Sequence, residues 1–325
     1  HRLRFRIERA HFHPVPETLD WDLWLGPAAA RPFTAGDAAY AEFVTAREIR
    51  YGRKPPPEEQ RFGYYAPFNW RGFYDFGSSL IGDWGIHILG PANWALQLHP
   101  RYLESVECIR KDALPPTTFP DELAIRYDFG PRPGMPPVSV FWYHHGSGDA
   151  YTPPGMSLDD ARKIPGTGPQ VGPQPGQGGF YGGSGGSTPA PPRPARNSGY
   201  NCIFVGSKGY LGTSGRGEGV GLLPGSRWAE YKLPDPYLQR SPGASTGSNH
   251  SSHARDWVRA CKGGAPACSH FGIAGPFTEW LVLGAAAVHY EGKLTWDDSR
   301  GEFSNNKDAN KWIKPAYRKG WTLKI

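Results

Sequence analysis

The sequence contains no cluster of basic residues and no long apolar segment. Although the formal net charge is +6, the lysines and arginines are scattered, and no run of five or more of them occurs. A surface that binds nucleic acid would need such clustering, so we expect no nucleic-acid partner. A transmembrane helix needs about 18 or more consecutive apolar residues. No segment approaches that length, and we expect no association with a membrane.

Cysteine is scarce, and the familiar nucleotide and metal motifs are missing. The four cysteines show neither a C-x-x-C motif nor the paired Cys/His spacing of a zinc site, so we expect no metal site. No G-x-G-x-x-G and no G-x-x-x-x-G-K-[ST] sequence is present, and neither is H-E-x-x-H. The chain by itself therefore shows no cofactor-binding site.

Glycine, proline and aromatic residues are abundant instead. The 325 residues include 43 glycines and 34 prolines, and 14% are aromatic. This composition predicts many turns and long loops rather than a helical bundle. Residues 151–198 are the richest in glycine and proline and contain too few apolar side chains to fold alone. We interpret them as a long loop that lies over neighbouring elements or as an arm that contacts another subunit.

Short β-branched and aromatic segments bounded by glycine or proline predict several strands. They are Arg2–Phe12, Val106–Arg110, Glu122–Phe129, Val138–His144, Leu294–Asp297 and a strand–turn–strand over Cys202–Leu211. Hairpin connections would make their sheet largely antiparallel. Apolar spacing predicts helices over His253–Lys262 and Gly275–His289, whereas the glycine-rich Gly212–Gly225 is expected to be a loop. We therefore expect the α+β class: one domain over residues 1–325, with a large, open, mostly antiparallel β-sheet and helices on one face.

The stretch Asn69–Leu89 concentrates aromatic and charged residues. From Leu80 onward its pattern predicts a helix, in which Gly82 and Gly85 allow a bulky group to approach closely. The following Gly90-Pro91 is expected to end this helix.

Two side chains of this helix invite a chemical interpretation. Asp83 and His87 are four residues apart, so on one helix they share a face. A carboxylate beside an imidazole forms a plausible acid/base pair. The structural alternative is that Asp83 caps the first turn and His87 is a core histidine with satisfied hydrogen bonds.

Several short motifs resemble those of a known enzyme family. They are P-E-T-L-D-W-D-L-W-L-G-P-A (Pro16–Ala28), N-W-R-G-F-Y-D-F-G (Asn69–Gly77), G-D-W-G-I-H (Gly82–His87), F-V-G-S-K-G (Phe204–Gly209), A-C-K-G-G (Ala260–Gly264), T-E-W-L-V-L-G (Thr278–Gly284) and Y-R-K-G-W (Tyr317–Trp321). In this order they are similar to hallmarks of the bacterial-type C-terminal domain of the Gfo/Idh/MocA oxidoreductases. The resemblance extends over nearly the whole chain and is poorest at residues 151–198.

The resemblance implies a two-domain enzyme that oxidises or reduces a sugar, inositol or related polyol with NAD or NADP. An N-terminal Rossmann domain would bind the nucleotide, and the sheet domain would form the substrate pocket and a homo-oligomer through its open sheet face. In that family an Asp-x-x-x-His pair lies beside the nicotinamide, which assigns catalytic roles to Asp83 and His87.

Four further residues become candidates for contacts with the substrate. Trp70 and Tyr74 would offer aromatic faces, and Arg71 and Asp75 would offer hydrogen-bond donors and acceptors for hydroxyl groups. Their structural alternative is an aromatic core with a structural salt bridge.

The sequence departs from the family pattern in two respects. It opens at Arg2–Phe12, in what we expect to be the first strand of the sheet domain, so the Rossmann domain and its lysine are expected to be absent from this chain. Gly90 also stands where the family commonly has an acidic residue. A Rossmann-domain partner could supply the missing half, in the bacterial cytoplasm or after export. The alternative function is a non-catalytic assembly or carbohydrate-binding protein built from the same sheet domain.

Overall fold

The structure is a computed structural model that describes residues 12–35, 69–120, 122–144, 152–157, 200–214, 219–232 and 249–322, with residues 45, 49, 54 and 65. Most of the strand expected over residues 2–12 and most of the arm expected over residues 151–198 lie outside this part. The chain divides into two compact units. The first contains residues 1–86, 96–148 and 259–325, and the second contains residues 87–95 and 149–258.

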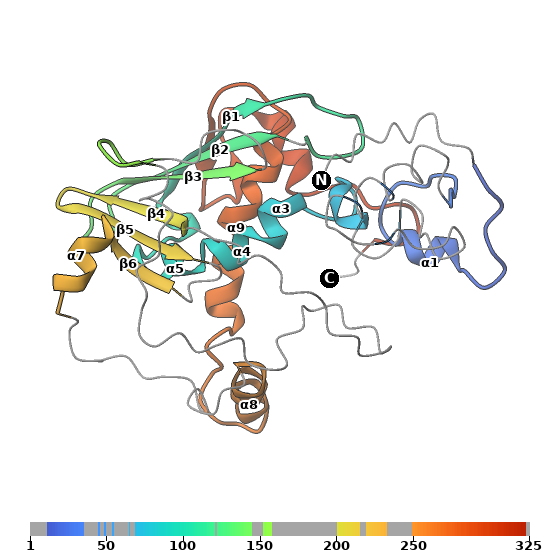
Figure 1. Cartoon of the computed structure of the whole chain (residues 1–325). Helices are drawn as coiled ribbons and strands as arrows, with labels where there is room; N and C mark the ends of the chain where they lie inside the picture. The colour runs from blue at the N-terminus through green and yellow to red at the C-terminus, as the bar shows by residue number, and fades with distance from the viewer. Residues whose placement is uncertain are drawn as a thin grey trace. The chain divides into compact units, whose positions relative to one another are not determined.

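The first unit is built on a five-stranded antiparallel sheet (Figure 1). Its strand order is β3-β2-β1-β7-β8. The strands are β1 (Leu103–Lys111), β2 (Leu123–Phe129), β3 (Val138–His144), β7 (Leu294–Asp297) and β8 (Glu302–Phe303). Four of the expected strands are thereby confirmed, as is the antiparallel pairing of their sheet.

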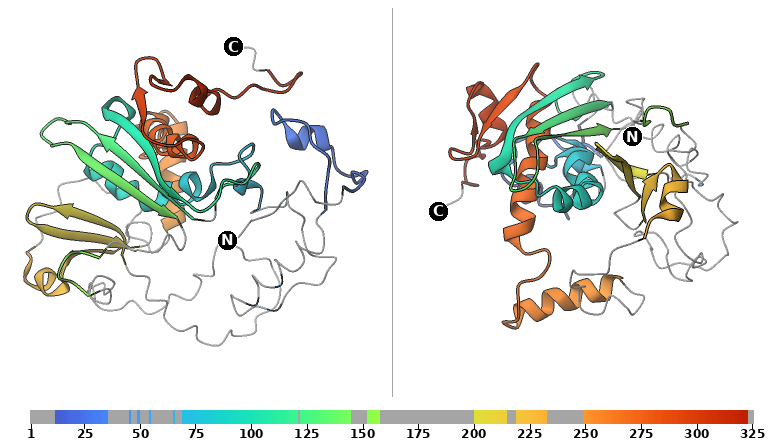
Figure 2. Two further views of the ribbon diagram at one scale, coloured as in Figure 1. Left: turned by 90° about the horizontal axis from the view of Figure 1, so that it is seen from above. Right: turned by 90° about the vertical axis from the view of Figure 1, so that its left-hand side faces the viewer.

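Helix α9 (Phe271–Ala287) covers one face of this sheet, as Figures 1 and 2 show. Alternation along β2 turns Tyr127 and Phe129 toward α9, where their rings lie 5.1 and 5.3 Å from that of Trp280. The Tyr127 hydroxyl donates a hydrogen bond of 2.7 Å to the carbonyl of Leu281. Gly284 makes this close approach possible, since a Cβ there would lie 2.1 Å from the Tyr127 hydroxyl oxygen.

The opposite face of the sheet is partly exposed and carries polar and aromatic side chains. Asp128 accepts hydrogen bonds from Arg126, Ser139 and Lys293 at 2.7, 2.6 and 3.3 Å. On the neighbouring strand, Phe141 and Tyr143 are each 44% exposed. Their rings are nearly parallel, with an angle of 11° between the planes and 6.4 Å between the ring centres. This face therefore presents two aromatic rings beside a network of charges.

The central stretch forms four short elements rather than one helix. They are η3 (Trp70–Gly72), α3 (Ser79–Asp83), α4 (Gly85–Ile88) and α5 (Gly90–Ala95). Helix α4 ends at Ile88, just before Gly90-Pro91, as expected, but a further helix, α5, begins at Gly90 itself. Proline is well suited to a first turn, where its missing N–H would have no partner in any case. The close approach expected at Gly85 is present: a Cβ there would lie 3.1 Å from the Leu281 side chain.

The N-terminal part of the described chain packs in an aromatic cluster and is hydrogen-bonded to the C-terminal segment. Helix α1 (Trp21–Leu25) stacks Trp21 on Trp24 at 4.9 Å, and Trp24 packs against Phe76 at the same distance. Arg318 donates hydrogen bonds to the carbonyls of Asp22, Gly26 and Ala28 at 3.0, 2.8 and 3.0 Å. It follows helix η5 (Lys307–Trp312).

The second unit contains a three-stranded antiparallel sheet, β4-β5-β6. Its strands are β4 (Tyr200–Gly206), β5 (Gly209–Ser214) and β6 (Gly219–Leu223), and α7 (Gly225–Glu230) follows. The prediction of a loop over residues 212–225 is therefore partly wrong, because these residues include the end of β5 and the whole of β6. Helix α8 (Asn249–Cys261) begins in this unit.

The α+β class is confirmed, with the described strands divided between a five-stranded and a three-stranded sheet. Among the helices of the described part, none is long and apolar enough to cross a membrane.

Candidate functional site

The structure brings two of the candidate residues together as an ion pair. The Arg71 guanidinium lies 3.3 Å from the Asp83 carboxylate, and their side chains are 18% and 35% exposed. Arg71 comes from η3, and Asp83 is the last residue of α3. Residues 69–77 and the start of the central helices are therefore connected through a charge pair that remains partly accessible to solvent.

A second charge pair lies at the other end of the same segment. Arg31 forms an ion pair with Asp75, and its guanidinium lies over the Phe76 ring at 5.1 Å from the ring centre. Asp75 is exposed, so one of its lone pairs can still be reached from solvent. Both carboxylates of this segment, at positions 75 and 83, are thus positioned by arginines.

Trp70 and Tyr74 occupy different environments. Trp70 is 42% exposed, so part of its indole surface faces solvent. Tyr74 instead packs against Phe119 and His289 at 4.6 and 4.5 Å. Its hydroxyl donates a hydrogen bond of 3.3 Å to the carbonyl of Pro115, and burial raises its pKa far above the usual range. The contacts of Tyr74 are those of a structural aromatic residue, whereas Trp70 offers a surface for stacking.

Asp83 and His87 lie on separate short helices. The first helix, α3, ends at Asp83, Trp84 interrupts the helical run, and His87 follows in α4. His87 is exposed. It is the first residue of the second unit, whereas the other five candidates belong to the first. The single continuous helix from which the pairing was inferred is therefore not formed.

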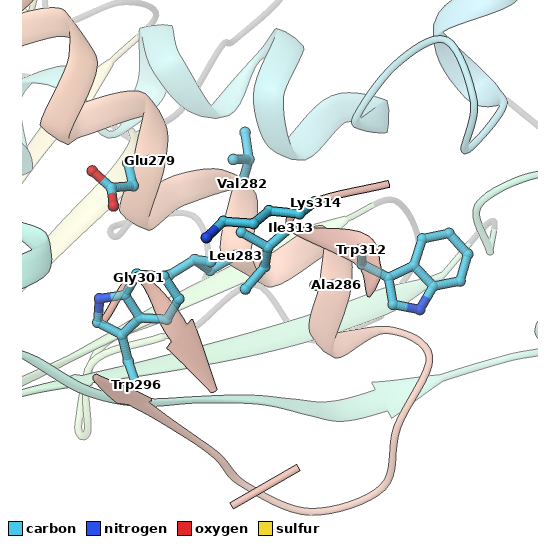
Figure 3. A pocket seen from close by; sticks show the side chains of 9 residues that line it. All are labelled: Glu279, Val282, Leu283, Ala286, Trp296, Gly301, Trp312, Ile313 and Lys314. Carbon is cyan, nitrogen blue, oxygen red and sulfur yellow. The ribbon is translucent and has the colours of Figure 1, made fainter. Parts of the chain in front are cut away.

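The first unit also contains a pocket that the sequence analysis did not predict (Figure 3). It has a volume of about 320 Å³ and lies between α9, β7 and the segment after η5. Its lining residues are Glu279, Val282, Leu283, Ala286, Trp296, Gly301, Trp312, Ile313 and Lys314. None of the six candidate site residues lines it. These residues come from three separate segments between positions 279 and 314, and no local sequence pattern shows that the three segments meet.

The described residues contain no group of three or more histidines, cysteines, aspartates and glutamates that could hold a metal ion. Comparison with known proteins finds neither a family model nor a curated protein sequence that matches the chain. The resemblance to Gfo/Idh/MocA oxidoreductases consequently rests on the short motifs alone.

Proposed function

We propose that this chain is the substrate-binding and oligomerisation part of an NAD(P)-dependent oxidoreductase that acts on a sugar, inositol or related polyol. The observation that carries the proposal is the Arg71–Asp83 ion pair in the same segment as the exposed Trp70. A polyol has vicinal hydroxyl groups that both donate and accept hydrogen bonds. A carboxylate and a guanidinium side by side can bind such a pair of hydroxyls, while an indole packs against the carbon-bound hydrogens of a sugar ring.

The packing of the motif segments supports the same proposal. The segment 16–28 contacts the segment 69–77 through Trp24 and Phe76, and Arg318 connects it to the segment 317–321. The segment 278–284 meets Gly85 through Leu281. These contacts join several of the segments that resemble the family's motifs within the first unit.

Within the proposal, Asp83 and Arg71 of the first unit hydrogen-bond the hydroxyl groups of the substrate. The resemblance gives His87 the role of accepting the proton of the reacting hydroxyl. The residues of this chain do not fit a nucleotide site, since its sequence has no G-x-G-x-x-G turn. Under the proposal, a Rossmann domain outside these residues binds NAD or NADP.

The oligomer is assigned to the uncovered face of the five-stranded sheet. Phe141 and Tyr143 expose aromatic surface there, and burial of such surface against a second copy would stabilise a homo-oligomer. The charges of Arg126, Asp128 and Lys293 beside these rings would fix the register of the two copies.

The proposal is tested with the native protein as the cell produces it. Polyol-dependent reduction of NAD or NADP is followed by absorbance over a panel of sugars and inositols. We expect Asp83→Asn and His87→Ala to reduce the rate by about 100-fold or more, in the range typical of a lost acid/base group. His253→Gln, a change at an exposed histidine of α8, is the matched control. Full activity in both site variants, or the lack of any polyol-dependent reduction, would contradict the proposal.

A second candidate function is a non-catalytic assembly or carbohydrate-binding protein. The uncovered sheet face favours it, because Phe141 and Tyr143 expose adjacent aromatic surface there that a partner could bury. The two functions differ in one measurement: the non-catalytic protein binds sugar or assembles without nucleotide-dependent turnover. Its binding would be lost in Phe141→Ser and retained in His87→Ala.

A further inference from the structure

Each residue of the Arg71–Asp83 ion pair has an exposed tryptophan as its neighbour in the sequence. Trp70 directly precedes Arg71 at the start of η3, and Trp84 directly follows Asp83 at the C-terminal end of α3. The two tryptophans are 42% and 39% exposed. The guanidinium and the carboxylate lie 3.3 Å apart, and all four residues belong to the first unit. An indole side chain therefore begins one residue away from each member of the ion pair.

Short, well-packed elements fix the backbone of both tryptophans. The carbonyl of Trp70 accepts a hydrogen bond of 3.1 Å from the N–H of Phe73, and the N–H of Trp84 donates one of 3.0 Å to the carbonyl of Leu80. Phe73 and Ile81 are 1% and 0% exposed, so both elements are anchored in the core. The two elements also pack against each other. The indoles are thus exposed on an anchored backbone.

Exposed aromatic surface beside a charge pair is suited to binding a carbohydrate. A sugar ring presents carbon-bound hydrogens on its faces and hydroxyl groups around its edge. The faces pack against aromatic side chains, and the hydroxyl groups hydrogen-bond to polar or charged side chains. Arg71 carries five N–H donors and Asp83 two acceptor oxygens, which is more than one contact between them requires. The pair can therefore bind hydroxyl groups of a ligand that also covers both indoles.

We propose that Trp84 is a second stacking residue of this site and that the substrate is a glycoside, a sugar whose anomeric oxygen carries a second ring. One ring packs on Trp70 and the other on Trp84, and hydroxyl groups between them bind Arg71 and Asp83. A single free ring in this arrangement covers one indole and leaves the other in water, so the site favours the glycoside. This inference rests on the proposed function and narrows its substrate class.

The test is a calorimetric titration of the native protein with matched glycosides. Methyl and phenyl β-D-glucopyranoside differ only in the group on the anomeric oxygen, and so do the corresponding galactopyranosides. Cellobiose and lactose carry a sugar as the second ring. We expect the compounds with a second ring to bind about 3- to 10-fold tighter than the methyl glycoside of the same series, a gain typical of one aromatic contact. A gain for the phenyl glycoside or for the disaccharide alone supports the inference and identifies the second ring.

Variants at position 84 show whether the indole is the source of this gain. We expect Trp84→Ala and Trp84→Leu to remove the preference for a second ring, since neither side chain has an aromatic face. Trp84→Phe should keep part of it. Trp257→Ala is the control, because it removes a tryptophan that is 63% exposed in α8, and it should leave the preference unchanged. Urea denaturation of each variant checks that the fold is retained.

Three results would count against the inference, and they are distinguishable. Equal affinity for the methyl glycosides and for all compounds with a second ring overturns it and leaves the proposed function intact, because the site then binds a single ring. A preference that survives in both Trp84→Ala and Trp84→Leu also overturns it alone. Absence of binding by every sugar contradicts the proposed function itself and, with it, this inference.

Discussion

Arg318 and Asp22 are separated by 296 positions in the sequence, and their side chains form an ion pair. The same guanidinium donates to the backbone carbonyl of Asp22 within α1 and to those of Gly26 and Ala28 just beyond its end. Carbonyls at and after a helix end have no partner within the helix, so Arg318 supplies a donor to Gly26 and Ala28. One side chain thereby connects the N-terminal aromatic cluster to the C-terminal segment.

Removing this side chain should destabilise the first unit. We expect Arg318→Met to lower the free energy of unfolding by about 2–3 kcal/mol, because several charge-assisted hydrogen bonds are lost together. The measurement is urea denaturation followed by tryptophan fluorescence. Arg300→Met removes an arginine from an exposed ion pair with Glu302 and is the control, with an expected loss below about 1 kcal/mol. Equal losses in the two variants would contradict the role given to Arg318.

Helix α9 contains two glycines for which different effects of alanine are expected. A Cβ at Gly284 would lie 2.1 Å from the Tyr127 hydroxyl oxygen, whereas a Cβ at Gly275 would meet nothing within 4 Å. We expect Gly284→Ala to destabilise the fold by about 1–3 kcal/mol through overpacking. Gly275→Ala should change the stability by less than about 1 kcal/mol, because the higher helix propensity of alanine is offset by its position directly before Pro276. Thermal unfolding of both variants provides the comparison, and equal losses in both would refute the close packing at Gly284.

Local sequence patterns predicted the strands whose side chains alternate between the two faces of a sheet. Residues 138–144 alternate between buried and exposed positions, and β3 forms there as expected. Strand β6 was not predicted, because residues 219 and 221 of this strand are glycines and glycine normally signals a turn. The start of α5 at Gly90-Pro91 was missed for a similar reason, because the same two residues can end one helix or begin another.

Contacts between distant segments could not be predicted in this way. The sequence identified Arg71 and Asp83 as candidates, but their ion pair depends on how η3 approaches α3. Tyr74 carried the same aromatic signal as Trp70, yet tertiary packing placed it against His289. The pocket combines residues of α9 and β7 with Lys314, and only the folded chain brings these three segments together.

His289 makes the stability of the first unit dependent on pH. Its ring stacks on Trp312 at 3.5 Å, and its Nε2 is buried without a hydrogen-bond partner among the described residues. Burial, with the positive charges of Lys111 and Lys311, lowers its pKa to about 4 from the ordinary 6.5. Between these values the unfolded chain binds the proton more readily than the folded one. The stabilisation is therefore complete above pH 6.5 and is lost as the pH falls toward 4.

Denaturation curves at several pH values test this expectation. Because the His289 ring is partly exposed, we expect a loss of about 1–2 kcal/mol on acidification across that window. His289→Phe keeps an aromatic ring against Trp312 but cannot titrate, so its stability should change less over the same window. The pKa of His99 is also lowered by burial and Arg101, so His99 would account for the pH dependence of stability that remains in this variant. An identical pH dependence in His289→Phe and the wild type would exclude His289 as the cause.

The Arg71–Asp83 ion pair allows functional and structural roles to be separated by a double-mutant cycle. Both side chains are partly exposed, and a pair of this kind contributes at most about 1 kcal/mol to stability. We therefore expect Arg71→Met, Asp83→Asn and the double variant to unfold within about 1 kcal/mol of the wild type. Polyol affinity, measured by titration calorimetry, should fall about tenfold or more in each single variant, because the hydroxyls lose a charged partner. A large coupling energy in stability, combined with unchanged polyol binding, would instead assign the pair a structural role, and the proposal that these residues bind the substrate would fail.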